Sequence, residues 1–301
     1  MIDKDFIAFQ EYIGKIKHLR RTGWVVRQVP NPETVAAHSW RMALMALHKA
    51  KELKAAGADV DRVVHICLLH DVGESVVGDI IPEIHQTEGP KISKEKKQQM
   101  ENEAVQFLAR TYHFPLLESA FNEYENQTTL EAKIVKNLDK LDMLLQAYEY
   151  ISVYPGLVRL NEFMEHNEKD VNLALFADDV QEIKLRQFAH KKTDNKFIDD
   201  MMLADALKHK PYNPTKANIP AYDTVAAHLF RMAIMALYLG KFSALSVIFQ
   251  NTHDDPNVAE LEQLENVQQA YEYIRLYPKE KSLYTYVQQK VLKGTNLCYK
   301  I

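Results

Sequence analysis

Apolar residues recur along this chain at intervals of three and four positions. Near the N-terminus these residues are Phe6, Phe9, Ile13 and Ile16, and later in the chain they are Leu130, Ile134, Leu138, Leu141, Leu145 and Tyr148. Such spacing places the apolar side chains on one face of an α-helix. The pattern therefore predicts an amphipathic helix over residues 3–19 and a long helix that begins near Leu130.

Further helices are predicted between these two. One runs from Val35 to about Leu53, with Thr34 as its N-cap, and its broad apolar character indicates burial. Another runs from Val60 to Glu74. The charged residues 91–97 are expected to form the solvated first turn of a helix whose inner face consists of Met100, Ala104 and Phe107.

The composition agrees with an all-α fold. Only 9 of the 301 residues are glycine, and strong helix formers are abundant. The formal net charge of -4 offers no electrostatic footprint for nucleic acid or for an anionic membrane, so neither is expected as a partner. Cys67 and Cys298 are far apart, which excludes a disulfide framework and a thiolate zinc site, and Cys67 is expected to be a small buried side chain.

The chain has no run that approaches the roughly 18 apolar residues of a membrane span. Its first residues have neither the basic nor the apolar region of a secretory signal. We therefore expect a cytoplasmic, soluble protein.

The sequence contains an internal repeat. Residues 33–47 recur as residues 223–237 with 11 of 15 positions identical, at an offset of 190. Residues 138–151 return as residues 261–274, at an offset of 123. The second copy has therefore lost 67 residues between these landmarks, and the lost part includes the counterpart of residues 68–79.

We interpret residues 1–168 as an active domain, 169–193 as a helical connector and 194–301 as a degenerate repeat. The second copy retains the two helices that would pack together. It is expected to stand where a homodimer partner would sit in an unduplicated relative, forming an intramolecular pseudo-dimer. The oligomeric state of the whole chain stays open.

Candidate chemistry is concentrated after an apolar stretch, where His70 and Asp71 are followed by Glu74 and Asp79. An isolated His-Asp pair is more often an ordinary charged helix end than a metal site. Two distant residues change this interpretation, because His38 on a buried helix and Asp139 beside the long apolar face complete a four-ligand nitrogen and oxygen set. Such a set suits a divalent metal ion, and a nearby unbound carboxylate could then move protons.

With these four residues in place, the chain resembles the HD-domain phosphohydrolase superfamily. Within it, the chain is most similar to the bacterial 5′-deoxynucleotidases and related HD-domain hydrolases. The resemblance covers roughly the first 155 residues. It rests on the segments Arg21-Thr22-Gly23-Trp24, Thr34-Val35-Ala36-Ala37-His38, His70-Asp71-Val72-Gly73-Glu74, Gly78-Asp79 and Leu138-Asp139-Lys140-Leu141-Asp142.

The resemblance implies an all-α fold and one divalent metal ion. It also implies that a water on this metal attacks the phosphomonoester of a nucleoside 5′-monophosphate, most simply a deoxynucleotide. The implied ligands are His38, His70, Asp71 and Asp139. Manganese, cobalt, iron, zinc and magnesium all remain open, because each accepts these ligands with different affinity.

The resemblance also assigns roles around the metal. Glu74 matches the proton donor, and Asp79 matches the carboxylate that meets the sugar hydroxyl. Trp24 matches the aromatic residue that shapes the sugar pocket against a 2′-hydroxyl. In the bacterial enzymes the phosphate-binding arginine directly precedes this tryptophan, where the present chain has Gly23. Arg21 is therefore the first candidate for the phosphate ligand, and Arg41 is the second.

Two functions stay open at this point. The first is a metal-dependent phosphomonoesterase that acts on nucleotides. The second is a non-catalytic protein that keeps the pocket in order to sense a nucleotide, which the decayed second copy and the displaced arginine suggest. A diiron oxygenase is less favoured, because no extra paired histidines flank His70-Asp71. The presence of Glu74 and Asp79 favours the enzyme, since a sensor has less need of a proton donor.

Overall fold

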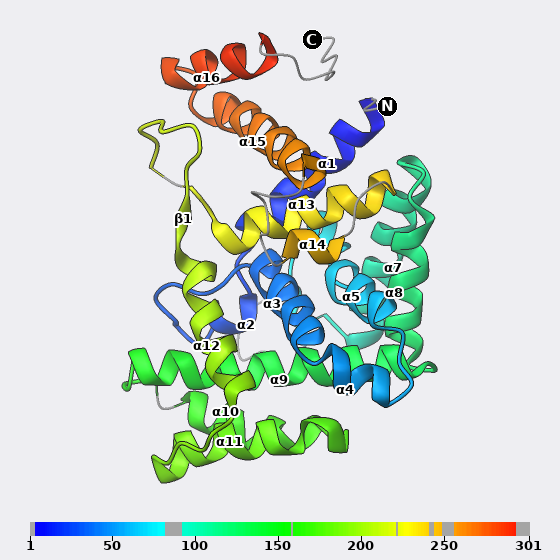
Figure 1. The fold of residues 1–301 in the computed structure, drawn as a ribbon, viewed down its shortest axis with the longest axis vertical. Helices are drawn as coiled ribbons and strands as arrows, with labels where there is room; N and C mark the ends of the chain where they lie inside the picture. The colour runs from blue at the N-terminus through cyan, green and yellow to red at the C-terminus, as the bar shows by residue number, and fades with distance from the viewer. Residues whose placement is uncertain are drawn as a thin grey trace.

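The computed structural model describes residues 4–81, 92–157, 159–220, 222–240, 244–248 and 256–292, and these residues form an all-α fold, as predicted (Figure 1). The elements are α1 (Lys4–His18), α2 (Thr22–Val25), α3 (Val35–His48), α4 (Ala50–Ala55), α5 (Val60–Leu69), α6 (Glu74–Val77), α7 (Lys94–Thr111), α8 (Pro115–Asn126), α9 (Leu130–Val153), α10 (Arg159–Asn167), η2 (Glu168–Asp170), η3 (Ala174–Phe176), α11 (Ala177–Ala189), α12 (Lys196–His209), β1 (Pro211–Tyr212), β2 (Asp223–Thr224), α13 (Val225–Leu239), α14 (Ala244–Ile248), α15 (Pro256–Leu276) and α16 (Lys281–Leu292). Lys91 and Cys298 lie outside the described residues.

The apolar period predicts the long helices well. In α9, Ile134, Leu138, Leu141 and Leu145 are buried. Side chains that accept a hydrogen bond from a backbone N–H three residues on cap the helix starts, as predicted at Thr34 and as also found at Thr129. Cys67 is buried, as expected.

Three details of the helix prediction were wrong. The helix that begins at Val35 ends at His48, because Lys49 leaves helical geometry with φ -91 and ψ 17. The helix that begins at Val60 ends at Leu69, so His70 and Asp71 lie in a turn that leads to α6. The inner face of α7 is formed by Ala104, Val105, Leu108 and Ala109. Phe107 is 45% exposed, and its ring packs edge-on against the ring of Tyr12.

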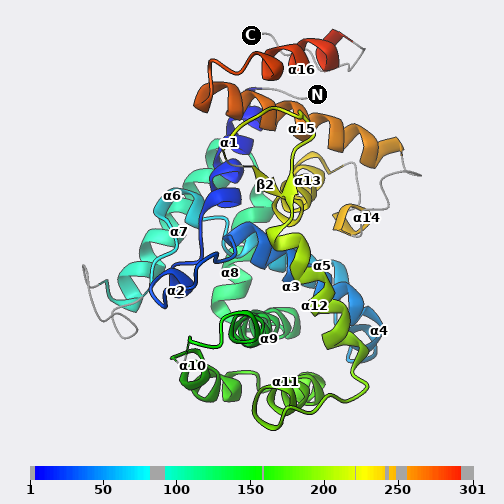
Figure 2. The same cartoon turned by 90° about the vertical axis from the view of Figure 1, so that its left-hand side faces the viewer.

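The repeated segments form corresponding helices. Helix α13 packs against α3, and α15 lies against α13. In both views α15 and α16 lie at one end of the molecule, and α10 and α11 lie at the other (Figures 1 and 2). One continuous hydrophobic core includes residues from both copies. The domain boundaries at residues 168 and 193 stay a prediction.

Within the described ranges, none of the helices is both long and apolar enough to cross a membrane. The two short strands β1 and β2 pair in antiparallel fashion, with Pro211 opposite Thr224 and Tyr212 opposite Asp223. This pairing fixes the chain that leads into α13. An isolated bridge between Arg20 and Thr34 does the same ahead of α3.

An aromatic cluster joins the N-terminal helix to the second copy. Phe9 of α1 is fully buried, and its ring centroid lies 5.4 Å from that of Tyr238 in α13 and 5.6 Å from that of Phe114. Tyr112 lies 5.8 Å away. The side chain of Phe9 therefore fills space that three aromatic rings from two other segments enclose.

We expect Phe9→Ala to lower the free energy of unfolding by about 3–5 kcal/mol, because it removes a buried ring and leaves a cavity. Chemical denaturation monitored by circular dichroism measures the change. Leu203, which is 75% exposed, provides the control. Leu203→Ala is expected to change the free energy by no more than about 0.5 kcal/mol. Equal effects of the two substitutions would contradict the role given to this cluster.

Candidate metal centre

Three segments distant in sequence bring the predicted ligands together. His38 comes from α3, His70 and Asp71 come from the turn after α5, and Asp139 comes from α9. One ligand atom each of His38, His70 and Asp71 lies within 4.8 Å of the others. Asp139 Oδ1 lies 3.3 Å from His38 Nε2, and Asp71 Oδ2 lies 3.2 Å from His70 Nε2. The structure thus brings His38, His70 and Asp71 together and places Asp139 against the His38 ring.

The two histidines present unused nitrogen atoms at this site. His38 Nε2 and His70 Nε2 are buried and have no hydrogen-bond partner. Each ring is held from the other side, since His38 Nδ1 lies 2.8 Å from Asp142 Oδ2 and His70 Nδ1 lies 2.9 Å from the carbonyl oxygen of Cys67. An Nδ1–H that donates to an oxygen leaves the Nε2 lone pair free for a metal. The donor set fits one divalent cation.

A second group of potential ligands consists of Glu33, His38 and Asp142. Its two carboxylates are already neutralised, because Lys208 contacts Glu33 and Arg41 contacts Asp142. This group therefore supports the His38 ring from behind. The metal centre lies on the Nε2 side of the ring.

The two ligand carboxylates are anionic. Burial acts to raise the pKa of Asp71, but His70, Arg21 and His38 together hold this pKa well below its usual range. Burial acts in the same direction on Asp139, whose pKa is lowered well below normal, chiefly by the contact with His38 and also by Lys136. Both groups are therefore in the form that binds a cation.

Glu74 has the opposite character. Its side chain is 4% exposed, and its Oε2 atom has no hydrogen-bond partner. Burial raises the pKa of Glu74 well above its usual value, and the negative charges of Asp71 and Asp79 raise it further. Burial and these charges therefore favour the protonated form of the Glu74 carboxyl group beside the ligands. Such a group suits a general acid.

Arg21 lies at the edge of the centre. Its Nη1 is 3.3 Å from Asp71 Oδ2, just before the start of α2. Burial acts to lower its pKa, but the carboxylates of Asp79, Asp71 and Asp139 raise the pKa above its ordinary value. The structure thus brings the first candidate phosphate ligand next to the metal ligands.

Asp79 is tied to the same corner of the molecule. The backbone N–H of Thr22 donates to Asp79 Oδ2 at 2.6 Å, and the Thr22 hydroxyl donates to the Asp79 carbonyl oxygen at 2.7 Å. These two bonds clamp the segment after α6 onto the start of α2. Arg21 and Asp79 are consequently held as one unit.

Trp24 is 3% exposed and packs edge-on against Tyr150 and Phe163, with both ring centroids 5.4 Å away. Its indole N–H donates to Glu33 Oε1 at 3.0 Å. The ring is therefore held rigidly beside the support network of His38. Its role against a 2′-hydroxyl stays a prediction.

Arg41 does not have the free hydrogen-bond donors that a phosphate ligand needs. The guanidinium is fully buried and bonds to Asp142, to both oxygens of Glu149 and to Gln146 Oε1 at 3.1 Å. A donor set occupied in this way has nothing left for a substrate phosphate. The hypothesis that Arg41 binds the phosphate is therefore corrected, and Arg41 instead holds Asp142.

Sequence reasoning gave no role to several residues of the centre. Tyr124 donates from its hydroxyl to Asp139 Oδ2 at 3.0 Å, and its ring lies 4.8 Å from that of His70. Asp142, one turn after Asp139 on α9, shares the inward face of that helix, and this spacing was the signal that could have revealed it. No sequence pattern pointed to Tyr124.

Lys97 also differs from its prediction. Residues 94–96 are exposed, as expected for a solvated first turn, but the Lys97 side chain is only 23% exposed and lies 3.2 Å from Glu101. Burial raises the pKa of Glu101 to about 7, and Lys97 opposes this rise. Glu101 and Glu74 in turn raise the pKa of Lys97. Lys97 thus adds a cation to the acidic side of the centre.

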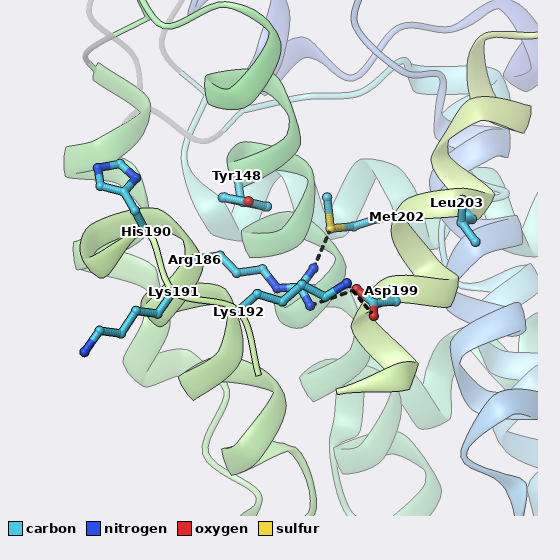
Figure 3. Close-up of a pocket in the computed structure, with 8 residues that line it drawn as sticks. All are labelled: Tyr148, Arg186, His190, Lys191, Lys192, Asp199, Met202 and Leu203. Atoms are coloured by element: carbon cyan, nitrogen blue, oxygen red, sulfur yellow. Dashed lines mark hydrogen bonds and ion pairs between the residues drawn. The ribbon is translucent and has the colours of Figure 1, made fainter. Parts of the chain in front are cut away.

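A hollow of about 840 Å³ opens elsewhere on the surface (Figure 3). It is lined by Tyr148, Arg186, His190, Lys191, Lys192, Asp199, Met202 and Leu203, none of which belongs to the metal centre. Two of its cations are already engaged, since Arg186 Nη2 and Lys192 Nζ each lie 2.9 Å from an oxygen of Asp199. We assign this hollow no part in the chemistry.

Comparison with known proteins agrees with the geometry. The family model for the HD domain matches residues 13–184, which include all four ligands. The 5′-deoxynucleotidase HDDC2 of Xenopus laevis is 38% identical over 164 residues, which are 53% of this chain and 76% of the relative. Its Homo sapiens counterpart is 37% identical over 165 residues, which are 54% and 76% of the two chains.

Two further matches come from other organisms. The 5′-deoxynucleotidase YGK1 of Saccharomyces cerevisiae is 36% identical over 165 residues, covering 52% of this chain and 72% of the relative. A solved structure of a conserved hypothetical protein from Pyrococcus furiosus is 32% identical and covers 59% of this chain and 98% of its own, with a TM-score of 0.49. Since the HD-domain model spans more than half of the sequence and encloses the four convergent ligands, this chain belongs to the HD-domain family.

Proposed function

We propose that this protein is a metal-dependent phosphomonoesterase that releases phosphate from nucleoside 5′-monophosphates, with deoxynucleotides as the expected substrates. One observation carries the proposal. Two buried histidine nitrogens that make no hydrogen bond lie next to two carboxylates and near Glu74, a buried carboxyl group whose pKa is raised. The relatives named 5′-deoxynucleotidase, which match the same part of the chain, support the nucleotide as the substrate class.

The ligands define what a bound cation would do. When bound by His38, His70, Asp71 and Asp139, a divalent ion supplies activation of water at neutral pH and compensation of phosphoryl charge. Two imidazole nitrogens favour a transition metal over magnesium, which prefers oxygen ligands. Manganese, cobalt, iron and zinc are therefore the proposed cofactors.

Arg21 is proposed to orient the phosphate. Its guanidinium is planar and permanently charged, and it already lies 3.3 Å from a ligand carboxylate. A phosphoryl group beside the metal centre would come within its reach and could accept two parallel hydrogen bonds. Asp79, clamped to the same corner through Thr22, is proposed to meet the sugar hydroxyl. Lys97 adds positive charge on this side.

Glu74 is proposed to donate the proton that the departing 5′-oxygen needs. An alkoxide is a poor leaving group, so a carboxyl group that remains protonated near neutral pH assists the bond cleavage. A protein that only senses nucleotides gains nothing from a buried, unpartnered acid, which costs stability. Glu74 therefore favours an enzyme over a sensor.

Substitution Asp71→Asn is expected to abolish phosphate release, because it removes an anionic ligand and the partner of Arg21. Phosphate release is measured on a panel of deoxyribo- and ribonucleoside 5′-monophosphates with added manganese or cobalt. Asp200→Asn is the control, since Asp200 pairs with His48 and Lys196 near the surface. A wild-type protein that binds nucleotide and metal but releases no phosphate would overturn the proposal in favour of a sensor.

Substitution Glu74→Gln is expected to lower kcat by about 10²–10⁴-fold, the usual contribution of a general acid. The pKa of Glu74 is raised, so the acid is protonated at low pH and the wild-type rate should fall as pH rises through that pKa. The variant should lose this alkaline limb of the kcat profile. A steep alkaline limb that survives in Glu74→Gln would assign the proton donor to another group.

A further inference from the structure

Each copy contributes one buried lysine that pairs with two carboxylates of the other copy. Lys17 of α1 contacts Asp223 ahead of α13, and its Nζ lies 2.5 Å from Glu265 of α15. Lys208 of α12 contacts Glu33 ahead of α3, and its Nζ lies 3.5 Å from Asp142 of α9. In the repeat, Asp223 corresponds to Glu33 and Glu265 to Asp142.

The surrounding contacts are matched as well. His38 Nδ1 lies 2.8 Å from Asp142, and His228 Nδ1 lies 2.5 Å from Glu265. The backbone N–H of Glu33 donates to Tyr150 at 2.7 Å, and that of Asp223 donates to Tyr273 at 2.8 Å. Arg41 and Arg231 each bond two carboxylates on the helix opposite.

These contacts resemble a twofold-symmetric interface. A residue of the first copy contacts a residue of the second, and the equivalent residue of the second makes the same contact with the first. Helix α1 packs on α13 of the second copy, and α12 packs on α3 of the first (Figure 2). Every member of the exchanged pairs is fully or almost fully buried. The second copy therefore supplies one ammonium group to the interior of the first.

Only one of the two networks leads to a metal centre. In the second copy Pro211 pairs with Thr224, and in the first copy Arg20 pairs with Thr34, the counterpart of Thr224 in the repeat. Tyr212, the residue after Pro211, therefore occupies the position that Arg21 holds in the first copy. The Tyr212 ring stacks on His228 with centroids 3.8 Å apart, and its hydroxyl donates to Glu262 at 3.2 Å. Glu262 corresponds to Asp139, so Tyr212 fills the place between the two remaining ligand positions.

We propose that Lys208, contributed by the degenerate copy, is a positioning residue of the metal centre in the first copy. Its Nζ contacts Glu33, which holds the Trp24 indole, and Asp142, which holds the His38 ring. It also donates to Gln146 Oε1 at 2.7 Å, and Gln146 in turn accepts from Arg41. Lys208 thus touches both supports of the site without touching substrate or metal. The catalytic part of this inference rests on the function proposed above.

The physical reason is the burial of two carboxylates. Glu33 and Asp142 are both fully buried, and removing the cation partner of a buried carboxylate is strongly destabilising. Without Lys208, Glu33 has no ion-pair partner among the described contacts, and Asp142 retains Arg41. A reoriented Glu33 no longer fixes Trp24, and an Asp142 that has lost one contact holds His38 less firmly.

The test uses the mirror-related lysines as a matched pair in the full-length chain. Lys208→Met and Lys17→Met each remove a buried ammonium group from an equivalent network. We expect both to lower the melting temperature of the metal-free protein. Only Lys208→Met should weaken manganese binding, by about 10- to 100-fold, the usual effect of losing support behind a ligand. Isothermal titration calorimetry with manganese alone provides this readout.

The kinetic readout separates positioning from mere stability. Lys208→Met should lower kcat and raise KM, whereas Lys17→Met should keep both within about twofold of wild type, because Lys17 pairs with Asp223 and Glu265 and with no residue that supports the centre. Lys208→Arg should restore part of the metal affinity, since it keeps the charge. Where Lys208→Met does not fold, the pairs Lys208→Met/Glu33→Gln and Lys17→Met/Asp223→Asn replace the single variants, because each also removes the unpaired charge.

Equal losses of metal affinity in the Lys208 and Lys17 variants, or no loss in either, would overturn the inference. A wild-type protein that binds manganese but releases no phosphate would contradict the proposed function alone. The calorimetric comparison between the two lysines would still decide the inference in that case.

Discussion

The buried carboxylate of Asp142 is the constraint on which the rest of the structure depends. It is fully buried at the middle of α9, where it meets His38, Arg41 and Lys208. Burial acts to raise its pKa, and the charges of Arg41 and Lys208 together with the His38 contact lower that pKa far below normal. An ionised group in such a place requires these partners, because removing one partner of a buried pair costs about 3–5 kcal/mol.

Asp142 thereby links three structural tasks. Through His38 it orients a candidate metal ligand, and through Arg41 it connects to Glu149, about two turns further along α9. Through Lys208 it joins the first copy to the second. The position of α9 relative to α3 is consequently fixed by charge as well as by apolar packing. This explains why a helix that supplies Asp139 to the metal centre can be placed accurately by contacts on the opposite side of His38.

Local features of the chain were predictable, and contacts between distant segments were only partly so. The apolar period predicted α1 and α9, because each buries one face, and broad apolar character predicted the buried helix α3. His38, His70, Asp71 and Asp139 could be assembled from ligand chemistry and a family resemblance. The structural role of Arg41 could not be predicted, because a buried arginine and a phosphate-binding arginine look alike in sequence. Phe107 was misplaced by one position, since α7 carries few apolar residues and its face is weakly defined.

Lys208 shows a further limit. Its partner Glu33 lies 175 residues away, and a lysine near the end of an amphipathic helix is ordinarily a solvated residue. Only the repeat hints at its role, since the segment around Lys17 is echoed around Lys208. The echo identifies equivalent residues, but it cannot tell which residue of the other copy each one meets. That information requires the three-dimensional arrangement.

The arrangement agrees with the interpretation that the second copy lost its chemistry while the protein kept its interior. The carboxylates of the exchanged pairs belong to the repeated segments, residues 33–47 with 138–151 and residues 223–237 with 261–274, and the two lysines belong to α1 and α12. The His70-Asp71 turn and Glu74 lie in the stretch that the second copy lacks. Loss of that stretch removes two metal ligands and the acid but leaves Lys208, Asp223 and Glu265 in place. Because the missing stretch carries none of the residues of the exchanged ion pairs, its absence leaves no charge of that network unpaired.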